Sequence, residues 1–492
     1  MLEATAFDAA SFRRAVECVV ARLDAYLRDC STRGLALTDP SALLDAARAL
    51  MRGEHDPLSP LDEHKLDAIV DLYIRTGIQV HSPGFMGRQF SGVIPLAAVV
   101  DLIGSTVNQP SSFYEAAQLP NVAERIMAEE LNRFIGWTPG RSAMVTTSGA
   151  SLANLTALLA ARNDRFPQLW SEGLASLGGE ARPAIAMGED AHYSISRAAG
   201  ILGIGGEQIV RLPMNRQRQI RADGVRAALR AAAGRGLRVF CLVGSAGTTP
   251  VGAFDPIGPL ATVAEEEGLW LHVDAAHGAS LLVSDRLRHK LHGIERADSF
   301  SWDAHKMMFV PAMCTLLFYR DKEKSYGAFR QDASYVFERE PDAYSAFESA
   351  AQSFECTKRP LIMGLWVLWA LYGRSIFAKK IEYLCRLAAD ARRILGEQPD
   401  FEALHEPEAN ILCFRYAPVN LRKPAPPDFQ VAIRNRIRRA GRFFISKVDL
   451  DGETALRVVF MNHRTDTGHF RMLLDEIRAA GRAVLAGADG DA

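Results

Sequence analysis

Short apolar runs with the character of strands alternate with longer helical stretches through the middle of the chain. AMVTTSG, for example, is followed at once by the helical pattern ASLANLTALLAARN. The strand-like runs are AMVTTSG (143–149), RVFCLVGSAG (238–247), LWLHVDAA (269–276), ADSFSWDA (297–304) and CTLLFYR (314–320). Alternation of this kind predicts an α/β domain with a largely parallel, buried sheet.

The two ends of the chain carry different patterns. Residues 11–30 and 41–52 have the apolar spacing of helices. Towards the C-terminus, further strand-like runs and a final helix predict a second, smaller α/β segment. These elements are NILCFRYAP (410–418), RFFISKVDL (442–450), TALRVVFMN (454–462) and a helix at 466–485. We therefore predict a helical segment at 1–80, a large domain at 81–375 and a small C-terminal domain at 376–492.

The composition of the 492 residues narrows the class of protein. A formal net charge of −1 gives no electrostatic reason to expect nucleic acid or an anionic membrane as a partner. The apolar stretch LIMGLWVLWALYG (361–373) is shorter than the roughly 20 residues of a membrane helix, and the N-terminus lacks the apolar core of a signal peptide. Seven scattered cysteines without a CxxC pair argue against a disulfide framework or a metal site, so we expect a soluble cytoplasmic protein.

Polar residues follow several of the predicted strands, at the edge where ligands bind in open α/β sheets. Among them Lys306 stands out, because the apolar residues 307–310 follow it directly. A buried lysine loses its hydration, so either this side chain snorkels to water or chemistry removes its charge. A desolvated lysine is a nucleophile and can form an imine with an aldehyde.

Three further elements at this edge match different parts of one cofactor. The small residues 149–151 lie at a strand-to-helix turn, where helix amides suit a phosphate group. Asp274 ends an apolar strand and can pair with a protonated pyridine nitrogen, and the imidazole of His192 can stack on a ring. Singly, these are also explained as a helix cap, a turn-capping aspartate and a structural histidine. Together with Lys306, they indicate a site for pyridoxal 5′-phosphate.

Eight segments also match, in order and spacing, the motifs of a known family. They are SPGFMGRQFSG (82–92), TTSGASLANLTALLAAR (146–162), DAHYSISRAAG (190–200), GTTPVGAFDPI (247–257), WLHVDAAHGAS (270–280), DSFSWDAHKMM (298–308), QDASYVFERE (331–340) and FECTKRPLIMGLW (354–366). The chain thus resembles the group II pyridoxal-phosphate-dependent amino-acid decarboxylases, which include glutamate, aromatic-amino-acid, cysteine-sulfinate and 2,4-diaminobutyrate decarboxylases. The fold implied is α/β, the aspartate aminotransferase-like fold type I, with a mostly parallel seven-stranded sheet in the large domain.

This resemblance assigns roles within the cofactor site. It implies that Lys306 holds the cofactor as an internal aldimine, that Asp274 pairs with the pyridine nitrogen and that His192 stacks on the ring. The other cofactor contacts that it implies are Ala150 and Ser151 at the phosphate with help from His305, Thr249 near the ring hydroxyl, and Ala276 beneath the ring.

The resemblance also implies the reaction, in which an L-amino acid loses its α-carboxylate as CO2 and leaves an amine. Tyr335 corresponds to the family's proton donor, which reaches across a dimer interface, so we expect a homodimer with the active site at that interface. Gln89, Ser91 and Arg457 correspond to substrate contacts of glutamate-type enzymes and favour an acidic substrate. For Arg457, a structural salt bridge is an equal alternative.

Departures from the family pattern keep other substrates open. Leu152 stands where the family often has glutamate, and His277 stands where relatives often carry an aromatic residue. An aromatic amino acid or 2,4-diaminobutyrate is therefore an alternative substrate. Two further alternatives are another enzyme of this fold, such as an aminotransferase or a carbon–sulfur lyase, and an inactive paralogue that serves as a scaffold.

Overall fold

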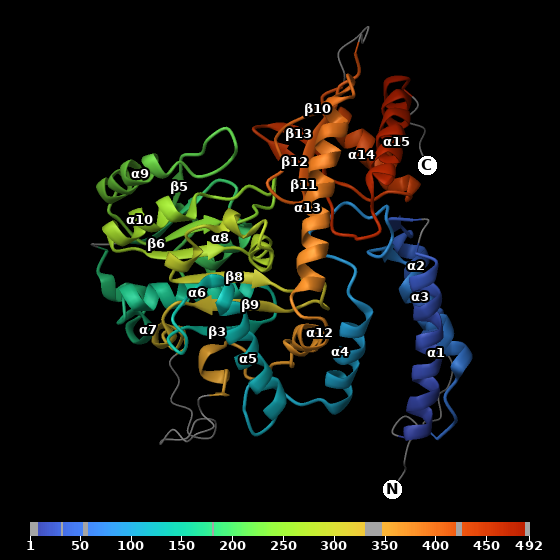
Figure 1. The fold of residues 1–492 in the computed structure, drawn as a ribbon, viewed down its shortest axis with the longest axis horizontal. Helices are drawn as coiled ribbons and strands as arrows, with labels where there is room; N and C mark the ends of the chain where they lie inside the picture. The colour runs from blue at the N-terminus through green and yellow to red at the C-terminus, as the bar shows by residue number, and fades with distance from the viewer. Residues whose placement is uncertain are drawn as a thin grey trace. The chain divides into compact units, whose positions relative to one another are not determined.

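The computed structural model describes residues 8–30, 33–52, 58–179, 182–329, 347–419 and 426–487. The chain divides into two compact units, whose elements are labelled in Figure 1. The first unit comprises residues 1–88, 390–404 and 413–492, and the second comprises residues 89–389 and 405–412.

A seven-stranded sheet forms the centre of the second unit. Its strands are β3 (Ala143–Thr147), β4 (Arg182–Gly188), β5 (Ile209–Leu212), β6 (Leu237–Ser245), β7 (Trp270–Asp274), β8 (Ser299–Asp303) and β9 (Thr315–Tyr319). They lie in the order β3-β9-β8-β7-β6-β4-β5. The strands from β5 to β8 run parallel to one another, whereas β9 lies antiparallel between β3 and β8. This arrangement confirms the predicted α/β fold with a mostly parallel sheet.

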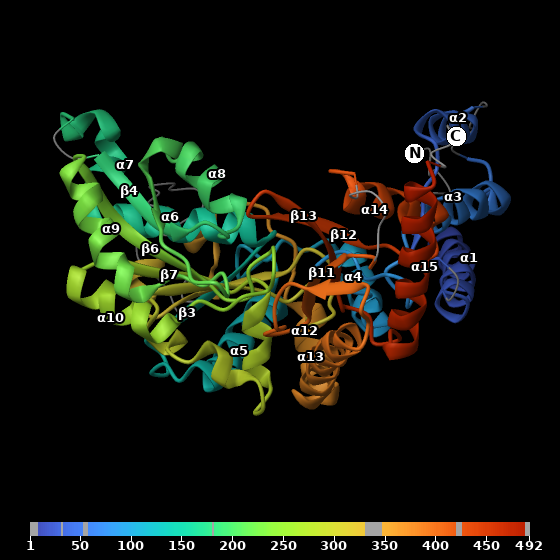
Figure 2. The same cartoon turned by 90° about the horizontal axis from the view of Figure 1, so that it is seen from above.

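Helices cover both faces of this sheet. The larger ones are α4 (Pro95–Val107), α5 (Gln118–Ile135), α6 (Ala150–Arg165), α8 (Tyr193–Ile201), α9 (Ala222–Gly234), α10 (Ile257–Glu267), α12 (Met363–Tyr372) and α13 (Ser375–Gly396), which continues into the first unit. Figure 2 shows α6 and α8 on one face of the sheet and α9 and α10 on the other. Right-handed crossovers require this distribution, because the chain moves outwards through α6 and α8 and returns through α9 and α10.

The strands of the sheet are buried on both faces, as their apolar sequences predict. Every residue of β8 and of β9 is buried. Large side chains fill the space between sheet and helices, with the rings of Phe166 and Phe240 in edge-to-face contact. The sheet is therefore a rigid platform for the polar residues at its carboxyl edge.

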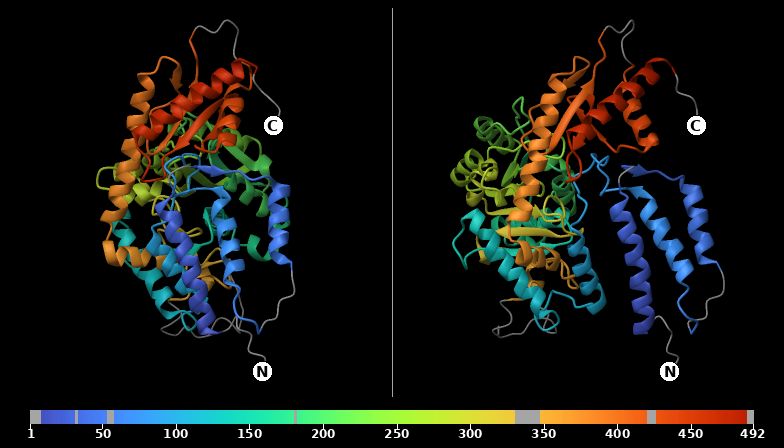
Figure 3. Two further views of the ribbon diagram at one scale, coloured as in Figure 1. Left: turned by 90° about the vertical axis from the view of Figure 1, so that its right-hand side faces the viewer. Right: turned by 45° about the vertical axis from the view of Figure 1, so that its right-hand side comes forward.

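The first unit combines N-terminal helices with a four-stranded sheet. Its elements are α1 (Ala9–Arg28), β1 (Leu35–Ala36), α2 (Pro40–Met51), α3 (Glu63–Arg75), β2 (Gly77–Ile78), β10 (Phe401–Ala403), β11 (Ile411–Tyr416), α14 (Phe429–Ala440), β12 (Ser446–Leu450), β13 (Glu453–Val459) and α15 (Thr467–Leu485). The sheet has the order β10-β11-β13-β12. Figure 3 shows α1 and α3 side by side, and the two helices are in contact.

The predicted elements at both ends of the chain are confirmed. Residues 11–30 and 41–52 correspond to α1 and α2, and the C-terminal helix corresponds to α15. The short strands β5 and β10 were not predicted, since four and three residues are too few to show a period. No helix in the described ranges is long and apolar enough to cross a membrane.

Candidate active site

A small cavity opens at the carboxyl edge of the seven-stranded sheet, where β6 and β7 end. Residues from several separate segments line it: Gln89, Ala150, His192, Ser245, Gly247, Thr248, Thr249, Asp274, Ala276, His277 and Lys306. Seven of them were predicted as site residues from the sequence: Gln89, Ala150, His192, Thr249, Asp274, Ala276 and Lys306. Parallel strands end at the same edge of a sheet, which is why segments distant in the sequence meet there.

Lys306 enters this cavity from the turn that follows β8. Its side chain is 20% exposed, and its Nζ lies 2.9 Å from Oδ2 of Asp303, whose side chain is only 2% exposed. Asp303 also accepts a hydrogen bond from the hydroxyl of Thr315. The Oγ of Ser91 donates a 2.8 Å hydrogen bond to the carbonyl oxygen of Lys306. The lysine is thus held by a buried carboxylate instead of extending into water.

Asp274 is the last residue of β7 and presents an ionised carboxylate to the cavity. Its Oδ2 accepts a 2.9 Å hydrogen bond from Nδ2 of Asn154, and its Oδ1 accepts a 3.2 Å hydrogen bond from the amide of Ala276. Burial alone would raise the pKa of Asp274. The electrostatic interactions with His192, Lys306 and His272, together with the hydrogen bond from the amide of Ala276, outweigh that effect, so the net shift of the pKa is downward.

His192 precedes α8 and caps it. Its Nδ1 accepts a hydrogen bond of 3.3 Å from the amide of Ser194 and lies 2.8 Å from the Oγ of the same residue. Burial lowers the pKa of His192, although the charge of Asp274 acts in the opposite direction. The imidazole is therefore neutral near pH 7, with its ring bordering the same cavity as Asp274 and Lys306.

The turn between β3 and α6 has the backbone expected of an anion-binding turn. Gly149 adopts a φ of 106°, a conformation that other residues rarely take, and a Cβ there would lie 3.3 Å from Sδ of Met313. Ala150 and Ser151 then begin α6, so that their amides belong to the helix N-terminus. The neighbouring Ser148 donates from its Oγ to the carboxylate of Glu355 at 2.6 Å.

The other predicted residues that the structure describes lie outside the lining of the cavity. Ser151 is exposed at the start of α6, and Nδ1 of His305 lies 3.0 Å from the carbonyl oxygen of Cys314. Arg457 belongs to β13 of the first unit, where its Nη1 donates a 3.2 Å hydrogen bond to Oγ of Ser446 and burial lowers its pKa to about 10. Tyr335 lies outside the described residues.

The sequence reasoning missed several polar residues of this site. Asp303 is the most informative, because a carboxylate three residues before a lysine, at the end of a strand, is placed to bind its ammonium. Asn154 lies in α6, one helical turn after the anion-binding turn, and contacts Asp274. Thr248 follows a predicted strand beside Thr249, and His277 was noted only as a departure from the family pattern, so neither was predicted as a site residue.

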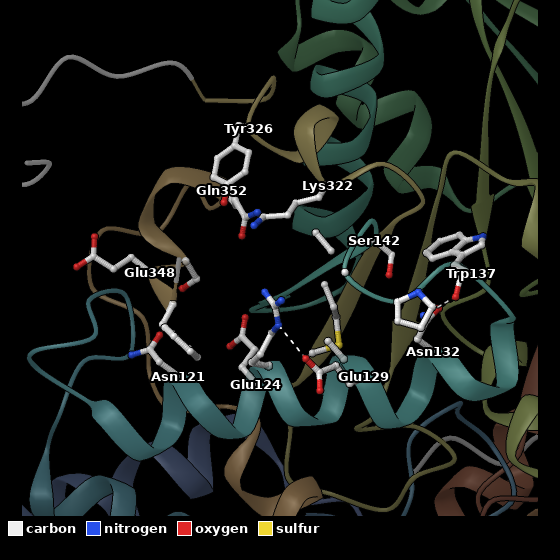
Figure 4. Close-up of a pocket in the computed structure, with 18 of the residues that line it drawn as sticks. Asn121, Glu124, Glu129, Asn132, Trp137, Ser142, Lys322, Tyr326, Glu348 and Gln352 are labelled. Atoms are coloured by element: carbon white, nitrogen blue, oxygen red, sulfur yellow. Dashed lines mark hydrogen bonds and ion pairs between the residues drawn. The ribbon is translucent and has the colours of Figure 1, made fainter. Parts of the chain in front are cut away.

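A larger cavity, of about 380 Å³, lies elsewhere in the second unit (Figure 4). Asn121, Glu124 and Asn132 project into it from α5, and Lys322 and Tyr326 lie on the opposite wall. Its lining shares no residue with the cavity at Lys306. Size therefore does not identify the reactive site in this protein; the chemistry of the side chains does.

Comparison with known proteins identifies the chemistry. Residues 50–417 match the family described as the pyridoxal-dependent decarboxylase conserved domain. The chain belongs to the pyridoxal-dependent decarboxylase family. Pyridoxal phosphate is the cofactor of this decarboxylase, and amino-acid decarboxylation is its reaction.

Individual relatives of the decarboxylase have acidic substrates in their names. It is 28% identical to the acidic amino acid decarboxylase GADL1 of Mus musculus over 433 residues, which are 85% of this chain and 77% of that protein. It is likewise 28% identical to the cysteine sulfinic acid decarboxylase of Homo sapiens over 408 residues, 82% of this chain and 80% of that protein.

Solved structures show the same fold. The crystal structure of mouse CSAD superimposes with a TM-score of 0.87 at 24% identity and covers 96% of this chain and 99% of that one. A structure of Oryza sativa TDC with PLP and tryptamine also has a TM-score of 0.87, at 21% identity, and covers 97% of this chain and 99% of that one. These two structures fit equally well, so the likeness shows the fold and does not select the substrate.

The residues of the decarboxylase cavity fit pyridoxal phosphate. The cofactor needs an amine for its aldehyde, an anion for its pyridinium nitrogen and donors for its phosphate. The cavity offers Lys306, the ionised Asp274, and the turn at Gly149 with the N-terminus of α6. Each group matches a different part of the molecule.

Proposed function

We propose that the protein removes the α-carboxylate of an acidic L-amino acid, of the glutamate, aspartate or cysteine-sulfinate type. The observation that carries the proposal is the meeting of Lys306, Asp274 and His192 in one cavity of a pyridoxal-dependent decarboxylase. The names of the relatives with 28% identity favour the acidic class over the aromatic and diamino classes.

The bound cofactor supplies an electron sink for the negative charge that remains when CO2 leaves. Lys306 would hold the cofactor covalently, and Asp274 would keep a proton on the ring nitrogen, so that this charge is absorbed. His192 would border the ring as a neutral imidazole. The helix N-terminus at Ala150 and Ser151, with His305, would bind the phosphate, while Thr249 and Ala276 would contact the ring.

Two further roles complete the reaction. Tyr335 would donate a proton to the α-carbon, which fixes the product as an amine. Gln89, which lines the same cavity as Lys306, would contact the substrate, and Arg457 would bind its side-chain carboxylate. Ser91 lies two residues after Gln89. Its hydroxyl donates a hydrogen bond to the carbonyl oxygen of Lys306 and would hold the backbone of the lysine in place.

Release of CO2 by the purified protein with added pyridoxal phosphate tests the proposal. The substrates to compare are glutamate, aspartate, cysteine sulfinate, an aromatic amino acid and 2,4-diaminobutyrate. We expect release from an acidic substrate and none from the Lys306→Ala variant. Release from only an aromatic or diamino substrate would overturn the substrate class, and release unaffected by Lys306→Ala would overturn the role of the lysine.

We also propose that the protein is a cytoplasmic homodimer whose active sites lie at the subunit interface. Helix α4 supports this, because its residues Val99, Ile103 and Val107 are more than half exposed. The segment before α4 is tied to the active site, since the amide of Ile94 donates a hydrogen bond to the carbonyl of Phe309. The seven cysteines, all of which lie in the described residues, form no disulfide, and this suits a reducing compartment.

Subunit mixing tests whether the active site is shared. Neither Lys306→Ala nor Tyr335→Phe should form the amine product alone, so amine formation is the activity to measure. If Tyr335 acts in the partner's site, mixed dimers regain one intact site, and random exchange restores about a quarter of the wild-type rate. No recovery in mixtures whose subunits demonstrably exchange would place both residues in the site of one subunit.

A further inference from the structure

A buried network of hydrogen bonds connects the two residues that would contact the cofactor ring, and its centre is Asn154. This side chain is 0% exposed. Its Nδ2 donates to Oδ2 of Asp274 and to Oγ of Ser194, each at 2.9 Å. Its Oδ1 lies 3.0 Å from Nε2 of His272. Both N–H donors and the oxygen of this amide are thus engaged inside the protein.

The direction of every bond in the network can be worked out from the chemistry of its ends. The ionised carboxylate of Asp274 only accepts, so the atom of Asn154 that faces it is the amide nitrogen. The other atom of the amide is then the oxygen, which also only accepts. Nε2 of His272 must therefore carry the proton that it shares with Asn154.

The contacts of the other ring nitrogen of His272, Nδ1, agree with this assignment. Its Nδ1 lies 2.8 Å from Oγ of Ser299, which in turn accepts a 2.9 Å hydrogen bond from the indole of Trp270. The hydroxyl proton of Ser299 is then available for Nδ1, as a neutral imidazole with its proton on Nε2 requires. Burial lowers the pKa of His272 to about 4, which keeps the ring neutral near pH 7.

The proton positions in the hydrogen bonds from Asn154 through Ser194 to His192 follow from the same reasoning. Ser194 accepts from Asn154, so its own hydroxyl proton points to Nδ1 of His192, 2.8 Å away. The amide of Ser194 donates to this same nitrogen. Nδ1 of His192 is consequently an acceptor, and the proton of the neutral ring sits on Nε2.

We propose that Asn154 is a positioning residue of the decarboxylation reaction: it orients the carboxylate of Asp274 and, through Ser194, fixes the tautomer of His192. One amide thereby sets both groups that would contact the cofactor ring. The inference rests on the roles proposed above for Asp274 and His192. The charged and titratable groups around this network are His192, His272, Lys306, Asp303 and Arg197.

Substitution of Asn154 by leucine, which has similar size and no polar atoms, tests the proposal without any substrate. The readouts are the affinity of the cofactor-free protein for pyridoxal phosphate and the pH dependence of the visible absorbance of the bound cofactor. We expect the affinity to fall by about tenfold to a hundredfold, the usual effect of losing a hydrogen bond to a buried charge. We also expect the pH midpoint of the absorbance to move.

Asn163→Ala is the matched control. Asn163 is also buried in α6, but its Nδ2 donates to the carbonyl of Gly327 at 2.8 Å, away from the cofactor site. This variant should leave both readouts at their wild-type values. Equal changes in both variants would show that general packing of α6 is responsible, and wild-type behaviour of Asn154→Leu would also overturn the proposal.

The Asp274→Asn variant distinguishes the proposed role of Asn154 from the proposed role of Asp274, on which it depends. If Asn154 acts through Asp274, adding Asn154→Leu to Asp274→Asn should cause little further loss of cofactor affinity. If Asp274→Asn alone has no effect, the proposed role of Asp274 fails; if it weakens binding and Asn154→Leu does not, only the role of Asn154 fails. Should Asn154→Leu not fold, Ser194→Ala removes one branch alone, and an unchanged pH midpoint in that variant would refute the link to His192.

Discussion

The ammonium of Lys306 lies 2.9 Å from the carboxylate of Asp303, a side chain that is almost completely buried. The lysine therefore has a counter-charge of its own before any cofactor is present. Covalent capture of the cofactor requires the neutral amine, so this ion pair must be broken for the reaction with the aldehyde to begin.

The Asp303→Asn variant should show how the ion pair affects the stability of the protein and how it affects capture of the cofactor. We expect the free energy of unfolding of the cofactor-free protein to fall by about 1–3 kcal/mol, because a hydrogen bond to a charged group is lost. Capture of pyridoxal phosphate at a fixed pH should be faster, because the ion pair no longer has to be broken first. The rise of the absorbance of the bound cofactor with time after mixing measures this. Asp164→Asn, at an exposed pair with Lys324, is the control; an identical capture profile in Asp303→Asn and wild type would contradict the prediction.

A second buried ion pair, between Lys358 and Glu124, should matter mainly for stability. The Lys358 side chain is 0% exposed, and Glu124 also accepts hydrogen bonds from the amide and hydroxyl of Thr146. Lys358→Met leaves a buried carboxylate without its cation and should reduce the free energy of unfolding in urea by about 3–5 kcal/mol. The double variant with Glu124→Gln should recover most of that loss. Failure of the double variant to recover any stability would show that the charge is not the cause.

Stability at low pH should depend on His272. Its pKa is about 4 in the folded protein, because burial disfavours the charged ring, whereas the ordinary pKa of histidine is 6.5. Between these two values the unfolded chain binds more protons than the folded one, so stability falls as the pH decreases from about 6.5 to about 4. The slope from one such group approaches about 1.4 kcal/mol per pH unit. Urea unfolding of His272→Gln should show a shallower decrease over this window, and an unchanged slope would exclude His272 as its source.

Glu355 should oppose binding of the cofactor. Its carboxylate accepts a 2.6 Å hydrogen bond from Ser148, next to the turn where we propose that the phosphate binds. Glu355→Gln keeps an acceptor for Ser148 and removes the negative charge, so the affinity for pyridoxal phosphate should rise severalfold. Fluorescence titration at low and high salt measures the effect, which should shrink as salt screens the charge. Glu323→Gln, at an exposed site, is the control; weaker binding by Glu355→Gln would mean that the carboxylate supports the turn.

The fold and several residues of the cavity could be predicted from the sequence, because both produce patterns within short segments of the chain. Apolar runs that end in a polar residue predicted β7 with Asp274 and β8 with the turn to Lys306. Asn154 produces no such pattern, because its importance comes from three partners that the fold brings to it from β7 and α8. A pattern along one element cannot reveal a bond between elements.

The order of strands in the large sheet has a consequence for how the enzyme is made. Within the described residues, β3, which leads into the anion-binding turn, pairs only with β9, and β9 follows Lys306 in the chain. β3 is the first strand of the large sheet to be synthesised, and its neighbour is made about 170 residues later, a separation that makes such contacts slow to form. Cofactor capture and closure of the sheet become late, coupled events in biosynthesis. Truncation anywhere before residue 319 removes the partner of β3 and should leave a chain that cannot retain pyridoxal phosphate.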